Sequence, residues 1–144
     1  MLQYQRRLLP VCVYLVLIFA ASSIPSLSPP GPDFVSKDKV AHVLEYSVLG
    51  VLLFRGAGGS PRPSRVATFA FLFAIGVTVA AVDEIYQSFI PGRMMSVYDW
   101  FADVSGIAVG VGIPAIAAKS GSARPRGRTG GRRDAGRASD RKPI

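Results

Sequence analysis

The sequence has little cysteine, little charge and a single histidine. One cysteine among 144 residues excludes an internal disulfide framework, because a lone thiol has no partner in its own chain. Charged residues make up only 18% of the chain and hydrophobic residues 49%, and the mean hydropathy is +0.33. This composition excludes a collagen-like or fully disordered chain and favours a membrane protein over a soluble globule.

The positive charge is concentrated at the C-terminal end. Residues 119–144 contain nine of the 17 basic residues, two of the nine acidic ones and almost no large apolar side chains. A segment this rich in Gly, Arg, Ser and Pro cannot bury a core, so we expect a disordered basic tail in the cytoplasm. Such a tail attracts anionic membrane lipids. Nucleic acid is not an expected partner, because no aromatic residues alternate with the arginines.

Four apolar stretches in residues 1–118 approach the roughly 20 residues that cross a bilayer. The first follows Arg6 and Arg7, as a signal peptide would, but no clear cleavage site follows it, so an uncleaved span is favoured. The second is interrupted by polar residues, and the third becomes polar near its end. The expected spans are about 8–27, 38–55, 66–88 and 98–118.

The basic residues predict the orientation of these spans. With the N-terminus in the cytoplasm, the inner side collects 14 basic residues and the outer side three, which are Lys37, Lys39 and Arg93. This distribution agrees with the positive-inside rule. The predicted fold is therefore all-α, a four-transmembrane-helix bundle with both termini inside, and residues 1–118 form its one domain.

Polar side chains gather at the outer ends of the second, third and fourth spans. Asp38, His42 and Glu45 fall within about 60° of one another on a helix, with Tyr46 at the border of this stripe. Ionisable groups at membrane depth are costly, so each of them needs a partner or a function. We expect His42 to pair with Asp38 or Glu45.

Small residues lead up to the acidic groups of the last two spans. Asp83 and Gln87 share a helix face with Gly76 and Ala80, and Glu84 lies beside that face. In the fourth span, one face carries Asp99, Asp103, Gly106 and Gly110. Because small residues permit close helix packing in membranes, we expect the two acidic patches to face each other.

Several of these groups also have purely structural explanations. Asp38 and Asp99 begin helices, where a carboxylate complements the helix dipole, and Ser96-x-x-Asp99 is a capping box. Arg93 either balances the acidic groups or binds an anionic head group through its planar guanidinium. By contrast, Asp83 and Glu84 oppose the dipole at their helix end, and Asp103 lies beyond any cap.

The polar pattern resembles the VanZ-like family. Three blocks carry the resemblance: Asp38-Lys39-x-x-His42-x-x-Glu45-Tyr46-x-x-Leu49-Gly50, Asp83-Glu84-x-x-Gln87-x-x-x-Pro91-Gly92-Arg93, and Ser96-x-x-Asp99-x-x-x-Asp103-x-x-Gly106-x-x-x-Gly110. The family more often has Asn where this chain has Asp103, which adds a charge here. The resemblance implies a small multi-pass protein of the bacterial cytoplasmic membrane and a link to glycopeptide (teicoplanin) resistance.

Three functions are open at this stage. The first is a site at the outer leaflet that binds or handles a lipid-linked cell-wall precursor, another envelope ligand or a glycopeptide. The second is an enzyme acting on a lipid-linked phosphate, with His42 as acid or base and Glu45 or Glu84 as further catalytic candidates, although the chain has no established nucleophile motif, histidine pair or phosphate loop. The third is a structural or partner-binding role.

The candidate ligand-binding residues are common to these hypotheses. We expect no organic cofactor, and a divalent cation would find oxygen ligands in Glu84, Asp99 and Asp103. The oligomeric state stays open. The binding set is Asp38, His42, Glu45, Tyr46, Asp83, Glu84, Gln87, Arg93, Asp99 and Asp103.

Overall fold

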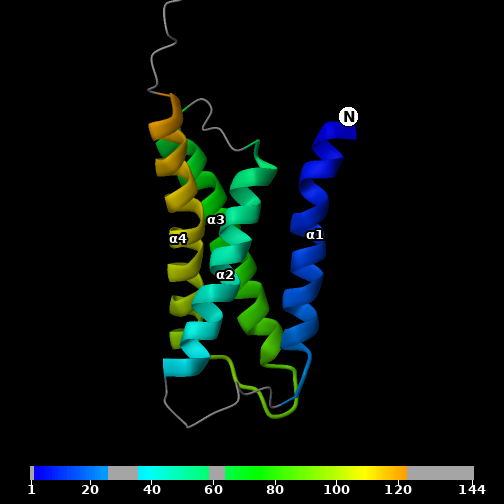
Figure 1. Ribbon diagram of the computed structural model, residues 1–144. Helices are drawn as coiled ribbons and strands as arrows, with labels where there is room; N and C mark the ends of the chain where they lie inside the picture. Colours follow the sequence, from blue (N-terminus) through cyan, green and yellow to red (C-terminus); the bar gives the residue numbers. More distant parts are fainter. Residues whose placement is uncertain (1, 26–35, 59–63, 123–144) are drawn as a thin grey trace, which may run out of the picture.

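The computed structural model describes residues 2–25, 36–58 and 64–122, and within these ranges it contains helices and no strands. The four helices run side by side as a bundle (Figure 1). They are α1 (Leu2–Ser22), α2 (Ser36–Gly56), α3 (Arg65–Gln87) and α4 (Val97–Ser122). The all-α prediction is thus confirmed, while residues 123–144 of the predicted disordered tail lie outside the described part of the chain.

Three of the helices are long and apolar enough to cross a membrane. The apolar segments are Gln5–Ser22 in α1, Val66–Gln87 in α3 and Val97–Ala118 in α4. The helix α2 is less apolar because the stripe of polar side chains described above interrupts it. Its exposed side nevertheless carries Val40, Leu44 and Val48, four residues apart along one face. The polar stripe of α2 therefore points mainly into the protein, where Leu49 and Phe54 are also buried, while one apolar face points outward.

The helix ends differ by a few residues from the predicted spans. The first helix begins at Leu2 and ends at Ser22, whereas the sequence placed its span at 8–27. It stops where Ser23 bonds back to the Phe19 carbonyl through both its backbone and its side chain. The proline at position 25 adds to this, since the residue before a proline is disfavoured in a helix. The fourth helix continues four residues past the predicted end at 118.

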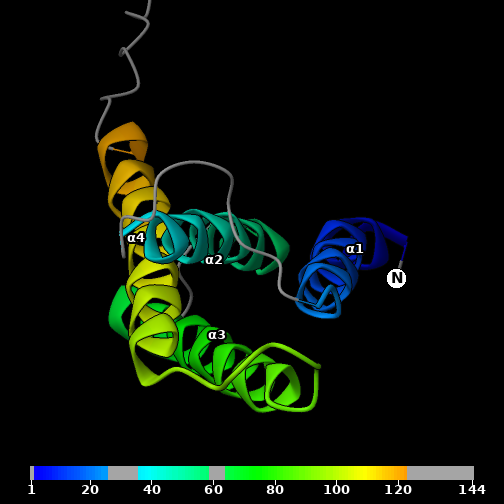
Figure 2. The same cartoon turned by 90° about the horizontal axis from the view of Figure 1, so that it is seen from below.

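The closest packing joins α2 and α4. A Cβ placed on Gly50 would lie only 2.9 Å from the Cα of Gly110, and one on Gly106 would lie 3.0 Å from the backbone nitrogen of Ser47. Viewed along the bundle, α2 crosses directly over α4, α3 lies against α4, and α1 stands to one side (Figure 2). The helix α1 packs against α2 and α3.

The glycine strip of the fourth helix therefore meets a different neighbour from the one expected. Gly106 and Gly110 face the α2 backbone, whereas the prediction directed them toward α3. The strip on α3 does face α4, since Gly76 packs against the Ile107 side chain. The Ile107 side chain of α4 fills the space left by Gly76 of α3. This contact therefore needs a glycine on α3 only.

The two ends of the bundle carry opposite charge. Arg6 and Arg7 of α1 and Arg55 of α2 line a hollow of about 370 Å³ at one end. The acidic side chains of α2, α3 and α4 gather at the other end, where α1 and α3 finish and α2 and α4 begin.

Candidate functional site

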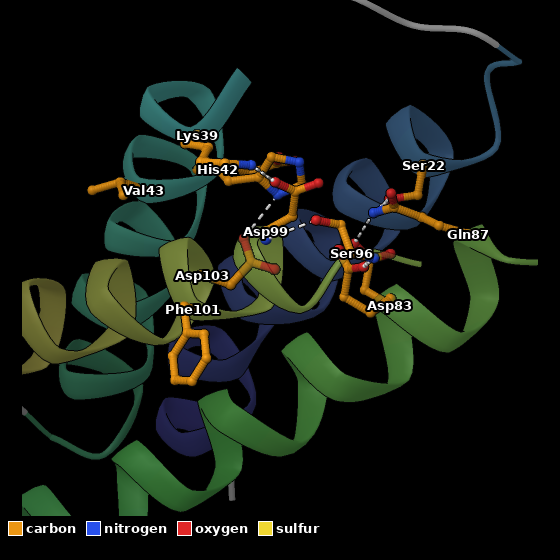
Figure 3. Close-up of polar contacts among 12 residues, drawn as sticks. Ser22, Lys39, His42, Val43, Asp83, Gln87, Ser96, Asp99, Phe101 and Asp103 are labelled. Carbon is orange, nitrogen blue, oxygen red and sulfur yellow. Dashed lines mark hydrogen bonds and ion pairs between the residues drawn. The ribbon is translucent and has the colours of Figure 1, made fainter. Parts of the chain in front are cut away.

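Five buried polar side chains from three helices form the centre of the acidic end. They are His42, Asp83, Glu84, Gln87 and Asp103, and between 0% and 9% of each residue is exposed. Figure 3 shows His42 on α2 facing Asp103 on α4, with Asp83 and Gln87 on the neighbouring turns of α3. The predicted convergence of α2, α3 and α4 is therefore present in the structure.

His42 is bound to Asp103. Its Nδ1 lies 2.9 Å from Asp103 Oδ1, and the side-chain exposures are 11% and 0%. The expected hydrogen-bond partners, Asp38 and Glu45 of the same helix, are not the ones used. This expectation was wrong because α2 docks closely on the glycine face of α4, which brings Asp103 within hydrogen-bond distance of the imidazole ring.

Glu84 links α3 to the start of α4. Its Oε2 accepts a 2.7 Å hydrogen bond from the backbone nitrogen of Ser96, while the Ser96 hydroxyl accepts one from the Asp99 nitrogen at 3.3 Å. In a capping box the acid three residues on would accept the bond from the cap nitrogen. Here Glu84 replaces Asp99 in that role, because Asp99 forms an ion pair with Lys39.

Gln87 connects the acidic cluster to the end of α1. Its amide nitrogen donates to Asp83 Oδ2 at 2.9 Å and to the Ser22 hydroxyl at 3.3 Å (Figure 3). Arg93 donates to Gln87 Oε1 at 2.8 Å and to the Ile24 carbonyl at 3.3 Å. Arg93 thus joins the site through an amide, and among the described residues it forms no ion pair with a carboxylate.

The remaining predicted residues line the edges of the cluster. Asp38 has a carboxylate oxygen within 4.8 Å of ligand atoms on His42 and Asp99. The backbone carbonyl of Glu45 accepts a 3.0 Å bond from the Tyr14 hydroxyl, and the Glu45 side chain is half-buried. Tyr46 is completely buried.

Two members of the site were missed by the sequence analysis. Lys39 was given no role in the site from the sequence, yet it pairs with Asp99 and lies 5.8 Å from the centre of the Tyr98 ring. Ser22 carried no signal, since a serine at the end of an apolar run is common. For Lys39, the available hint was its position directly after Asp38 at the polar start of α2.

Several buried polar atoms of the site have no hydrogen-bond partner in the described part of the chain. Such groups are rare in folded proteins and each calls for a physical explanation. Three of them belong to carboxylates whose other oxygen is bonded, Asp83 Oδ1, Glu84 Oε1 and Asp103 Oδ2. The full set is Tyr46 Oη, Asp83 Oδ1, Glu84 Oε1, Trp100 Nε1 and Asp103 Oδ2.

The side chains also form two groups with metal-ligand spacing. In one group, ligand atoms of His42, Glu84 and Asp103 all lie within 4.8 Å of one another. In the other, the same is true of Asp38, His42 and Asp99. The three acids named as metal candidates from the sequence are thus divided between the two groups, with His42 common to both.

A lateral groove leads from the outside of the bundle to Glu84. Its volume is about 350 Å³, and its exposed lining is apolar. The lining residues are Ala81, Glu84, Ile85, Met95, Ser96, Val97 and Trp100. The groove therefore offers an apolar surface next to a buried carboxylate.

A comparison with protein-family models assigns the chain. The model described as VanZ/LLP1 matches residues 8–118. The chain belongs to the VanZ/LLP1 family. No curated protein and no solved structure matches it significantly.

The VanZ/LLP1 match contains the whole site. It begins within α1 and ends within α4, so Ser22, the α2 stripe, Glu84 and Asp103 all lie inside the family region. Family membership together with three long apolar helices identifies a VanZ-like membrane protein. Within that class, the buried histidine, carboxylates and amide are groups that can bind a cation, exchange a proton or hold a polar head group.

Proposed function

We propose that this VanZ/LLP1 family protein binds a lipid-linked envelope ligand at the outer leaflet of the bacterial cytoplasmic membrane. In this proposal α2 also crosses the bilayer, both termini are cytoplasmic, and the acidic end faces outward. The helix α2 has 21 residues and so a length of about 32 Å, close to the thickness of a hydrocarbon core. Its outward Val40, Leu44 and Val48 suit contact with lipid.

The observation that carries the proposal is the groove beside Glu84. Ile85, Met95, Val97 and Trp100 give it apolar walls, and Glu84 and Ser96 also line it, with the Glu84 carboxylate buried beneath the apolar surface. Ligand sites are mostly apolar with a few polar groups that fix orientation. An amphiphile fits this arrangement, with its hydrocarbon chain in the groove and its head group against the buried cluster.

Tryptophan fluorescence tests this proposal directly. The chain has one tryptophan, Trp100, and it lines the groove. In phosphatidylcholine nanodiscs, addition of a polyprenyl phosphate should change the Trp100 emission in a saturable manner. Ala81→Phe fills the groove and should abolish this response, whereas Val82→Phe lies on the exposed side of the same helix and should retain it. An unaltered response in Ala81→Phe, or an equal response to phosphatidylglycerol, would contradict the proposal.

The proposed link to glycopeptide resistance has a cellular test. Teicoplanin susceptibility is measured together with folded yield for His42→Asn, Glu84→Gln and Arg93→Lys. Normal yield with lost protection supports a working site. Lost yield in all three supports instead an internal clamp that fixes helix packing, for which the Glu84 bond to Ser96 is the favouring contact.

An enzyme acting on a lipid-linked phosphate is the second candidate. The favouring observation is the 2.9 Å contact between His42 and Asp103, since a carboxylate-held imidazole is a common acid or base. Release of phosphate from a polyprenyl pyrophosphate by the purified protein, abolished in His42→Asn, would favour this candidate over simple binding.

A further inference from the structure

The group formed by His42, Glu84 and Asp103 has the spacing of ligands around one metal ion. Their ligand atoms lie within 4.8 Å of one another. Two ligands of the same ion are separated by at most twice the metal–ligand bond, which is about 4.2 Å for Mg²⁺ and about 4.8 Å for Ca²⁺. The 2.9 Å between His42 Nδ1 and Asp103 Oδ1 also equals the separation of adjacent ligands on an octahedral ion with bonds of about 2.1 Å.

The unpartnered carboxylate oxygens supply an independent indication of a ligand. Glu84 is 3% exposed and Asp103 0% exposed, yet Glu84 Oε1 and Asp103 Oδ2 are buried without a hydrogen-bond partner. The other oxygen of Glu84 is held by the Ser96 nitrogen, so this side chain cannot turn freely to find another partner. A cation coordinated by these two oxygens satisfies both atoms at once.

The charge around the cluster also requires compensation. Among the described residues, six carboxylates lie at this end of the bundle, against three permanent cations, which are Lys37, Lys39, which pairs with Asp99, and Arg93, which bonds to an amide. Uncompensated charges in a poorly solvated interior are costly. They would also repel the phosphate of a lipid-linked ligand, unless a cation lies between the two.

We propose that His42, Glu84 and Asp103 bind one divalent cation of the Mg²⁺ and Mn²⁺ type. Carboxylate oxygens are preferred ligands of such ions. Structural zinc sites, by contrast, are typically rich in thiolates, and this site has none. The ion would then replace the proton between Nδ1 and Asp103 Oδ1, and the ring proton would reside on Nε2. Asp38 and Asp99 offer carboxylates within 4.8 Å of a ring nitrogen. Carboxylates commonly hold metal-binding histidines in this way. Resting on the proposed function, the ion would bridge these residues to the ligand phosphate.

Manganese is the probe for the test, because its electron spin reports its ligands. The full chain is purified with a tag that lacks histidine, and free Mn²⁺ is titrated by electron paramagnetic resonance. We expect one bound Mn²⁺ per chain and an imidazole nitrogen coupling in the spin-echo modulation. His42 is the only histidine, so this coupling identifies it without ambiguity.

Matched variants separate the two candidate groups. Glu84→Gln and Asp103→Asn keep hydrogen-bond acceptors in place and should weaken Mn²⁺ binding roughly 10- to 100-fold. Ser105→Ala, on the exposed side of α4 two residues from Asp103, should change it less than about threefold. Absence of the nitrogen coupling in the wild-type chain overturns the proposal, whether or not the variants fold. A large loss in Asp99→Asn with none in Asp103→Asn overturns it as well, because the ion would then occupy the other group.

The cation and the lipid are tested in separate measurements. The manganese titration is made without polyprenyl phosphate, and the Trp100 response is measured with Mn²⁺ and with EDTA. Mn²⁺ binding without a Trp100 response refutes the lipid function and leaves the ion site standing. If the titration shows no Mn²⁺ binding and the Trp100 response persists in EDTA, the ion site is refuted and the lipid function stands.

Discussion

At the scale of single residues, the two ion pairs of the site differ in their exposure to solvent. The side chains of Lys39 and Asp99 are 33% and 15% exposed, whereas those of His42 and Asp103 are 11% and 0% exposed. A partly exposed pair contributes little, because water screens it and ordering long side chains costs entropy. Removal of one partner from a buried pair leaves an uncompensated polar group in the interior, which is far more costly.

This difference predicts unequal effects of two substitutions. In EDTA, His42→Leu should lower the free energy of unfolding by about 3–5 kcal/mol, because the Asp103 carboxylate loses its partner. Lys39→Met should lower it by about 0.2–1 kcal/mol. Reversible unfolding in mixed detergent micelles measures both. Adding Asp103→Asn to His42→Leu should restore part of the lost free energy of unfolding. Equal losses in His42→Leu and Lys39→Met would contradict the conclusion that the His42–Asp103 pair is the more buried one.

The sequence identified most residues of the site but not their partners. Helical spacing placed Asp38, His42 and Glu45 on one face, and that face does point inward. The spacing within α2 could not reveal that Asp103 of α4 would be the bonded partner, since this depends on how two distant helices dock. The same reason hides the Glu84 bond to Ser96, for which the local pattern offered Asp99 instead.

At the scale of helices, the contact between α2 and α4 depends on glycine. A Cβ on Gly110 would collide with the Ser47 carbonyl, which belongs to backbone and cannot move aside as a side chain does. A Cβ on Gly112, two residues along the same helix, would lie 3.7 Å from the Phe69 ring, an ordinary contact. The two glycines therefore have different structural importance despite their proximity.

Alanine substitution should distinguish these glycines. Gly110→Ala should destabilise the protein by roughly 1–3 kcal/mol, because the added methyl forces α2 and α4 apart. Gly112→Ala should change stability by less than about 0.5 kcal/mol or raise it, since alanine favours the helix. Thermal unfolding in detergent, followed by circular dichroism, compares the two. Equal losses of stability in the two variants would show that the α2–α4 distance does not depend on the missing side chain at Gly110.

Helix identity was readable from the sequence, while helix pairing was only partly so. Long apolar runs predicted four helices, and the described part of the chain contains four. Small residues correctly marked the close contacts of Gly76, Gly106 and Gly110, because only a missing side chain lets backbones approach. The strips themselves did not indicate which helix they contact. The α4 strip was wrongly predicted to face α3, whereas it faces α2.

At the scale of the whole molecule, the bundle has a basic end and an acidic end. Arg6, Arg7 and Arg55 lie together at one end, and the buried carboxylates lie at the other. The positive-inside rule predicts that such a molecule keeps its arginines in the cytoplasm. We therefore expect the proposed site to face the envelope, where lipid-linked precursors carry their head groups.

Cysteine labelling tests this orientation. In a chain with Cys12→Ala, a cysteine introduced at Met94 should react with a membrane-impermeant maleimide in intact spheroplasts. A cysteine introduced at Ala57 should react only after lysis. Both positions are exposed, so accessibility to the reagent depends on the side of the membrane. The reverse pattern would place the acidic end inside and refute the proposed orientation.

The close contact between α2 and α4 has a consequence for biogenesis. The ribosome makes α2 long before α4, yet α4 supplies the Asp103 partner of His42 and the glycine face on which α2 rests. A nascent chain that ends after α3 exposes the polar stripe of α2 without its cover. In the proposed topology, in which α2 also crosses the bilayer, insertion of this least apolar helix should therefore be completed only after α4 leaves the translocon.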